Sequence, residues 1–111
     1  MSRIDRINAL IKEEIAHILQ RKMRDQHIGF ISITNVDVSK DMSHAKIYFS
    51  QIGTDKEKKK TLNTLKTASR FIKGEIGKVI RLKHIPDLQF IFDESLERGF
   101  DIVDKINKLS K

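Results

Sequence analysis

The sequence predicts an α+β fold in which helices cover a sheet of three strands. Apolar residues recur every three or four positions in two long stretches, about residues 3–24 and 55–82, a pattern typical of amphipathic helices. In three shorter stretches they alternate with polar residues, which is typical of half-buried strands. A chain of 111 residues is long enough for one hydrophobic core, so we expect a single domain over residues 1–111.

The first predicted helix covers about residues 3–24. Its apolar positions are Ile4, Ile7, Leu10, Ile11, Ile15, Ile18 and Leu19. We expect Ser2 to cap this helix, because its hydroxyl can accept a hydrogen bond from an amide of the first turn, and Asp5 adds a favourable negative charge there. The last turn carries Arg21, Lys22 and Arg24, whose charges suit the unpaired carbonyls of a helix end.

Two predicted strands follow, about residues 29–38 and 43–52. In the first, the apolar residues change parity between Ile33 and Val36, which a regular strand cannot do without an extra residue. We therefore expect a bulge near Thr34-Asn35. The second strand has its apolar positions at Ala45, Ile47 and Phe49.

The longest predicted helix covers about residues 55–82. Its apolar stripe consists of Leu62, Leu65, Ala68, Ile72, Ile76 and Val79. The opposite side carries Lys59, Lys66, Arg70, Lys73 and Arg81. Gly74 and Gly77 each weaken a helix by about 1 kcal/mol relative to alanine, so we expect a bend or a break inside this stretch.

The third predicted strand follows Pro86, which disfavours helix at Ile85. In this strand Leu88, Phe90 and Phe92 alternate with Gln89, Ile91 and Asp93. Residues 94–109 then predict a short C-terminal helix, with apolar positions at Phe100, Val103, Ile106 and Leu109.

Positive charge is concentrated in one part of the chain. Residues 56–83 contain ten basic and two acidic residues, a net charge of +8, whereas the whole chain has +7. A concentrated positive surface attracts a polyanion, because neutralising phosphates releases condensed counterions. The charge therefore favours nucleic acid as the partner, with an anionic membrane surface and an acidic protein as alternatives.

Several function classes find no support. The chain has no cysteine, which excludes disulfide bonds and thiolate metal sites. The histidines, His17, His27, His44 and His84, are scattered without metal-ligand spacing. There is no Gly-x-Ser-x-Gly motif, no phosphate-binding loop, no apolar signal region at the start and no apolar run long enough to span a bilayer. We expect no enzyme activity, metal or cofactor.

Gly74-Glu75-Ile76-Gly77 matches the Gly-x-x-Gly loop with which KH domains hold a nucleic-acid backbone. Two features favour helix glycines over such a loop. Glu75 would repel a phosphate, and Ile76 belongs to the apolar stripe of the predicted helix.

The element order helix, strand, strand, long helix with a kink, strand is that of a type II KH domain. More specifically, the chain resembles the ribosome-binding factor A family over nearly its whole length. The resemblance rests on the strings at 3–7, 29–42, 45–50, 71–77, 81–90 and 92–95.

This resemblance implies a bacterial, cytoplasmic, non-enzymatic assembly factor. Members of the family bind the small (30S) ribosomal subunit and its 16S rRNA, support late maturation and processing of the rRNA 5′ end, and matter most in the cold. The resemblance implies no cofactor, no small-molecule substrate and no membrane, and we expect a monomer. The runner-up is a general KH module that binds single-stranded RNA or DNA.

Two positions depart from the family pattern. The family has an Ala-x-Gly kink between two helices where this chain has Ala68-Ser69-Arg70, so we expect a mild bend at Ser69-Arg70 or a break displaced to Gly74. Asp25-Gln26-His27 stands where the family usually has Asp-Pro-Arg.

The candidate RNA contacts are basic residues in and beside the long helix. The first group is Arg70, Lys73, Lys78, Arg81 and Lys83. The second group is Lys66, Arg3, Arg6 and the run Lys56–Lys60. Exposed aromatic residues are not evident, which favours recognition of backbone and shape over stacking of single-stranded bases.

Overall fold

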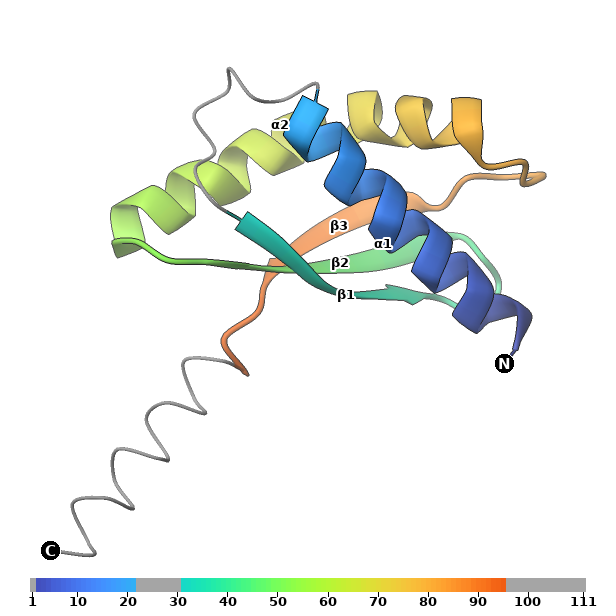
Figure 1. The fold of residues 1–111 in the computed structure, drawn as a ribbon, viewed down its shortest axis with the longest axis horizontal. Coiled ribbons are helices and arrows are strands. Elements are labelled where there is room, and N and C mark those ends of the chain that lie inside the picture. The colour runs from blue at the N-terminus through green and yellow to red at the C-terminus, as the bar shows by residue number, and fades with distance from the viewer. Residues whose placement is uncertain (1, 22–30, 96–111) are drawn as a thin grey trace, which may run out of the picture.

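The computed structural model describes residues 2–21 and 31–95 (Figure 1). The elements are α1 (Arg3–Arg21), β1 (Ile31–Val38), β2 (His44–Gln51), α2 (Asp55–Val79) and β3 (Asp87–Phe92). The predicted α+β class and element order are confirmed. Four of the predictions concern residues outside these ranges. They are the helix end at 22–24, the departure from the family pattern at 25–27, the strand start at 29–30 and nearly all of the helix over 94–109.

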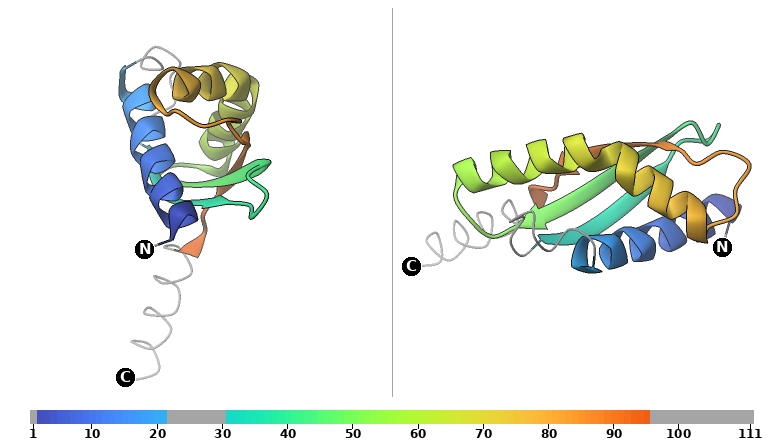
Figure 2. Two further views of the ribbon diagram at one scale, coloured as in Figure 1. Left: turned by 90° about the vertical axis from the view of Figure 1, so that its right-hand side faces the viewer. Right: turned by 90° about the horizontal axis from the view of Figure 1, so that it is seen from above.

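The three strands form one sheet in the order β1-β2-β3. β1 and β2 are antiparallel and joined by a hairpin, whereas β2 and β3 are parallel. Parallel neighbours need a crossover connection, and α2 provides it. Both helices pack on the same face of the sheet and leave the other face uncovered in the described part of the chain (Figure 2).

The predicted bulge is present in β1. Ile33 pairs with Phe49 and Asn35 pairs with Tyr48, so Thr34 is the extra residue. The bulge keeps the apolar residues before and after it on the helix-covered face, as the change of parity required. The Thr34 hydroxyl donates a hydrogen bond to the Asp93 carboxylate just after β3. This hydrogen bond is the main cause that lowers the pKa of Asp93.

The core lies between the helices and the sheet. Its buried residues are Ile7, Ile11, Ile15, Ile18, Val36, Val38, Ala45, Ile47, Phe49, Leu65, Ile72, Ile76, Ile80 and Phe90. The prediction of the apolar stripes is wrong at two positions, because the side chains of Leu10 and Val79 are 49% and 62% exposed. Leu10 lies at the edge of the α1 stripe. Val79 is the last residue of α2, and the capping residue Ile80 takes the buried position instead.

Both helices begin with reciprocal capping. The Asp5 amide donates to the Ser2 hydroxyl at 3.1 Å, and the Ser2 amide donates to the Asp5 carboxylate at 3.2 Å, which confirms the predicted cap. At the start of α2, the Glu57 amide donates to the Thr54 hydroxyl at 3.2 Å, and that hydroxyl donates to the Glu57 carboxylate at 3.1 Å.

α2 is one unbroken helix from Asp55 to Val79, so the alternative of a break at Gly74 is wrong. The helix changes direction near its middle, in its yellow part, which agrees with the expected mild bend (Figure 2). Among the described residues other than glycine, Met42 alone has a positive φ, so Arg70 has ordinary helical geometry. Gly74 and Gly77 lie within α2, which confirms the prediction that they are helix residues and not part of a KH-type loop.

Candidate nucleic-acid interface

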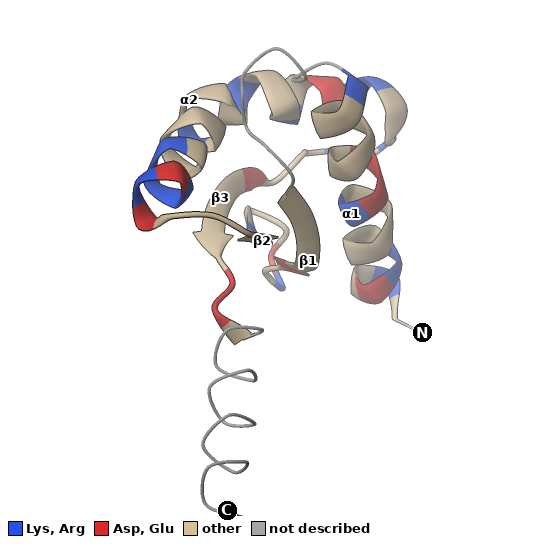
Figure 3. Ribbon diagram, turned by 60° about the vertical axis from the view of Figure 1, so that its left-hand side comes forward, with Lys and Arg blue, Asp and Glu red and all other residues tan. Residues whose placement is uncertain are grey.

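Most of the basic candidates lie on α2 and in the loop that follows it, and Arg3 and Arg6 lie in the first turn of α1 (Figure 3). The side chains of Arg70, Lys78, Arg81, Lys83, Lys66, Arg3 and Arg6 are exposed, and that of Lys73 is intermediate. Arg81 was predicted on the helix, but α2 ends at Val79 and Arg81 belongs to the following loop. The prediction failed because the Ile80 backbone, with ψ of 121°, already leaves the helical conformation.

Some of these candidates lie at opposite ends of the molecule, whereas Lys66, Arg70 and Lys73 lie between them on α2. The first turn of α1, the β1–β2 turn and the loop after α2 lie at one end, so Arg3 and Arg6 are at the same end as Arg81 and Lys83 (Figure 1). The run Lys56–Lys60 begins α2 at the other end. At 1.5 Å per residue, the 25 residues of α2 extend over about 37 Å.

A shallow depression of about 650 Å³ lies between the C-terminal half of α2 and the segment that leads into β3. Its lining residues are Arg70, Lys73, Gly74, Gly77, Lys83, His84, Ile85 and Asp87. Three of the first-group candidates therefore meet around one hollow, although Lys83 is 13 residues from Arg70 in the sequence. The sequence alone did not predict this arrangement.

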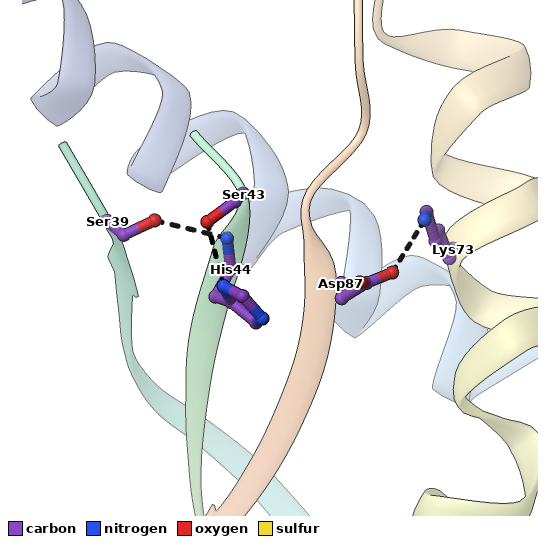
Figure 4. Close-up of polar contacts among 5 residues, drawn as sticks. All are labelled: Ser39, Ser43, His44, Lys73 and Asp87. Carbon is purple, nitrogen blue, oxygen red and sulfur yellow. Dashed lines mark hydrogen bonds and ion pairs between the residues drawn. The ribbon is translucent and has the colours of Figure 1, made fainter. Parts of the chain in front are cut away.

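One acidic residue interrupts the basic lining. The Lys73 ammonium lies 2.7 Å from the Asp87 carboxylate, so this ion pair joins α2 to the start of β3 (Figure 4). The hydrogen bond and charge of Lys73 lower the pKa of Asp87, with smaller contributions from the charges of His44 and Arg70. Lys73 is therefore engaged within the protein, and a phosphate must compete with Asp87 for it.

Lys78 is also engaged. Its ammonium lies 3.0 Å from the Glu75 carboxylate one turn earlier on α2. The side chain of Lys78 is 71% exposed, so this pair contributes little to stability and leaves the ammonium accessible from solvent.

The run Lys56–Lys60 does not act as a uniform patch. Lys58 points toward the sheet, with its ammonium 4.9 Å from the centroid of the Phe92 ring. Phe92 in turn packs edge-on against Phe49, with ring centroids 5.6 Å apart. Among the described residues, Phe71 is the only exposed phenylalanine, which leaves no aromatic platform for stacked bases.

A polar network closes the β1–β2 turn and was not predicted. The Asp41 carboxylate accepts hydrogen bonds from the hydroxyl and amide of Ser43 and from the Ser39 hydroxyl. The hydrogen bond from the Ser43 hydroxyl is the main cause that lowers the pKa of Asp41 to about 2. The same hydroxyl is hydrogen-bonded to Nδ1 of His44 at 2.8 Å (Figure 4). These hydrogen bonds hold the turn between β1 and β2 in place.

Metal binding and membrane insertion find no support in residues 2–21 and 31–95. No group of three or more histidine, aspartate or glutamate side chains is placed to hold a metal ion within these ranges. None of the helices in them is long and apolar enough to cross a membrane.

Comparisons with known proteins agree with this architecture. The family model of ribosome-binding factor A matches residues 3–106. A relative from Trichodesmium erythraeum with that name is 42% identical over 111 residues, which covers 98% of this chain and 81% of the relative. The crystal structure of ribosome-binding factor A from Thermus thermophilus has a TM-score of 0.71 at 21% identity, covering 81% of this chain and 96% of that one.

A third match is a homology model of Thermus thermophilus ribosome binding factor A fitted into the cryo-EM map of a 30S–RbfA complex. Its TM-score is 0.65 at 22% identity, covering 78% of this chain and 91% of that one. The two structural matches support the fold, and the sequence matches identify the family. The chain belongs to the ribosome-binding factor A family, as the sequence resemblance predicted.

Proposed function

We propose that this chain is a non-enzymatic assembly factor that binds the small (30S) ribosomal subunit through its 16S rRNA. Membership of a family of ribosome-binding factors supports this function, and so does the fit of a Thermus thermophilus homologue to a 30S complex. In this proposal residues 1–111 act as one KH-like domain and as a monomer, without cofactor, membrane or small-molecule substrate.

The finer role follows from the family resemblance. We propose that the protein acts in the cytoplasm, where it supports late maturation of the subunit and processing of the rRNA 5′ end, and that it matters most in the cold. Docking on an immature subunit would favour one conformation of the rRNA over others, because a ligand shifts an equilibrium toward the state that it binds more tightly.

The observation that carries the proposal is the exposed basic surface of α2 and the loop after it. Arg70 and Lys83 border the depression, and Lys66 continues the same side of α2. Arg81 is a further first-group contact in the loop after α2, and Arg3 and Arg6 are secondary contacts at the same end of the molecule (Figure 1). Lys73 and Lys78 would contribute after exchanging their carboxylate partners for phosphates.

Sedimentation of the protein with separated ribosomal particles tests this function. We expect saturable association with small subunits at one site, tighter for immature than for mature subunits, and little association with large subunits. Equal association with every particle, or preferred tight binding to a short unstructured oligonucleotide, would support the general KH module instead. Retention of binding after the partner is treated with ribonuclease would favour an acidic protein or lipid as partner.

A further inference from the structure

The depression beside α2 has the charge and size to take more than one phosphate. Arg70, Lys73 and Lys83 border it, and His84 adds a group that can donate hydrogen bonds. The hollow is shallow and open to solvent, and its basic residues come from both α2 and the loop after it. An extended chain of phosphates fits such a basic, open surface better than an isolated anion does.

The glycines expose the α2 backbone inside this depression. A Cβ atom added at Gly74 would meet nothing within 4 Å, and one added at Gly77 would lie 3.5 Å from the Ile85 side chain, an ordinary contact. Packing within the described protein therefore does not require glycine at position 74, where alanine would strengthen the helix. A ligand that approaches the helix backbone closely gives glycine a role there.

Asp87 occupies the position where a phosphate on Lys73 would lie. Its backbone is held by the sheet, because Asp87 is paired with His44 and its amide donates to the Ser43 carbonyl at 3.0 Å. Its side chain is 68% exposed and that of Lys73 is 38% exposed. An ion pair this accessible to solvent contributes little to stability, so Lys73 can exchange partners readily.

We propose that Asp87 is an internal competitor for Lys73 in a depression that binds the sugar-phosphate backbone of an RNA strand. The strand lies against Gly74 and Gly77, its phosphates contact Arg70 and Lys83, and one phosphate replaces the Asp87 carboxylate on Lys73. Competition by Asp87 weakens the binding of a single small anion, because that anion gains only the contact with Lys73 that Asp87 gives up. An RNA strand is weakened less, because it gains contacts with several basic residues at once. This inference rests on the proposed function in taking rRNA as the partner.

Asp87→Asn tests the competition, with affinity for immature small subunits measured over a range of salt concentrations. Removing an exposed competing charge should tighten binding by up to about fivefold. It should also steepen the slope of log affinity against log salt by up to about 0.7, because Lys73 then meets phosphate without first leaving a carboxylate. Asp37→Asn makes the same charge change on β1 and should alter affinity less and the slope hardly at all.

Repeating Asp87→Asn in a protein that also carries Lys73→Gln shows whether Asp87 acts through Lys73 or through its charge alone. There, Asp87→Asn should no longer tighten binding, since the side chain for which it competes is absent. The same gain with and without Lys73 would overturn the proposal, as would equal gains from Asp87→Asn and Asp37→Asn. If the unaltered protein does not bind subunits at all, the proposed function itself fails, which is a different result.

Gly74→Gln tests the approach to the helix backbone. The added side chain should raise thermal stability and lower subunit affinity at least as much as Lys73→Gln does. His17→Gln places the same side chain at an exposed position of α1 outside the depression and should leave affinity unchanged. Unchanged affinity in a folded Gly74→Gln protein would exclude a strand from this surface. Inorganic phosphate that displaces the subunit at low millimolar concentration would show a small-anion site instead, and would also contradict the proposal.

Discussion

Changing Lys66, Arg70 and Lys83 to glutamine tests the proposed interface most directly. All three side chains are exposed, and none forms an ion pair within the described part of the chain. Each phosphate contact contributes about 0.7–0.9 to the slope of log affinity against log salt, so three lost contacts should lower the slope by about 2.1–2.7. Raising the salt from about 50 to 200 mM should then weaken the unaltered protein about 20- to 40-fold more than the variant.

Fluorescence anisotropy of the labelled protein, titrated with immature small subunits at four or five salt concentrations, gives this slope. A matched triple variant changes Lys12, Arg21 and Lys46 to glutamine, which removes the same charge from α1 and β2. If both triple variants lower the slope equally, the effect comes from net charge and the assignment of contacts to α2 is refuted.

Stability should be unaffected by the first triple variant. Exposed substitutions away from caps and ion pairs usually change the free energy of unfolding by no more than about 0.5 kcal/mol each. Denaturant unfolding checks this, and a large loss of stability would mean that reduced binding reflects unfolding.

Three further predictions concern the fold. Phe90→Ala should cost about 3–5 kcal/mol of unfolding free energy, and Ile91→Ala clearly less because it lies on the uncovered face; equal losses by urea titration would refute the register. Arg70→Gly should cost about 1 kcal/mol, whereas a gain would reveal strain in α2. The hydrogen bond from Ser43 is the main cause that lowers the pKa of Asp41 from 3.8 to about 2. The Asp41 carboxylate therefore stabilises the fold fully above pH 3.8, and this stabilisation is lost as the pH falls through about 2. The melting temperature of Asp41→Asn should be lower than that of the unaltered protein above pH 3.8, and the difference should shrink as the pH falls from 3.8 to about 2.

The strand and helix patterns predicted most of the described fold because local periodicity reports which face is buried. The parity change between Ile33 and Val36 located the bulge at Thr34 within one residue. Helix ends were predicted less well. The apolar period continues through Val79 as if α2 went on, but the chain leaves the helix at Ile80 to reach Pro86. That choice depends on where β3 must begin, which is a property of the sheet.

The candidate site was predicted in composition but not in arrangement. Counting charges identified Arg70, Lys73 and Lys83, and the helical period placed the first two on one side of α2. The ion pair between Lys73 and Asp87 crosses from helix to strand over 14 residues, and the contact of Lys58 with Phe92 crosses over 34. Such contacts depend on the parallel pairing of β2 with β3, which the charge pattern does not contain.

The spacing of charge along α2 bears on what kind of RNA the protein can recognise. The run 56–60 lies 14 to 18 residues before Gly74, or about 21–27 Å along the helix. At about 3.4 Å per nucleotide, the rise of a stacked strand in B-form DNA, a stacked strand needs roughly six to eight nucleotides to reach both positions. Because α2 is one continuous helix packed on a sheet, it cannot fold around a shorter strand. A folded RNA surface can present phosphates from separate strands at this spacing without ordering a flexible chain, and this geometry favours a structured subunit over a short oligonucleotide as the partner.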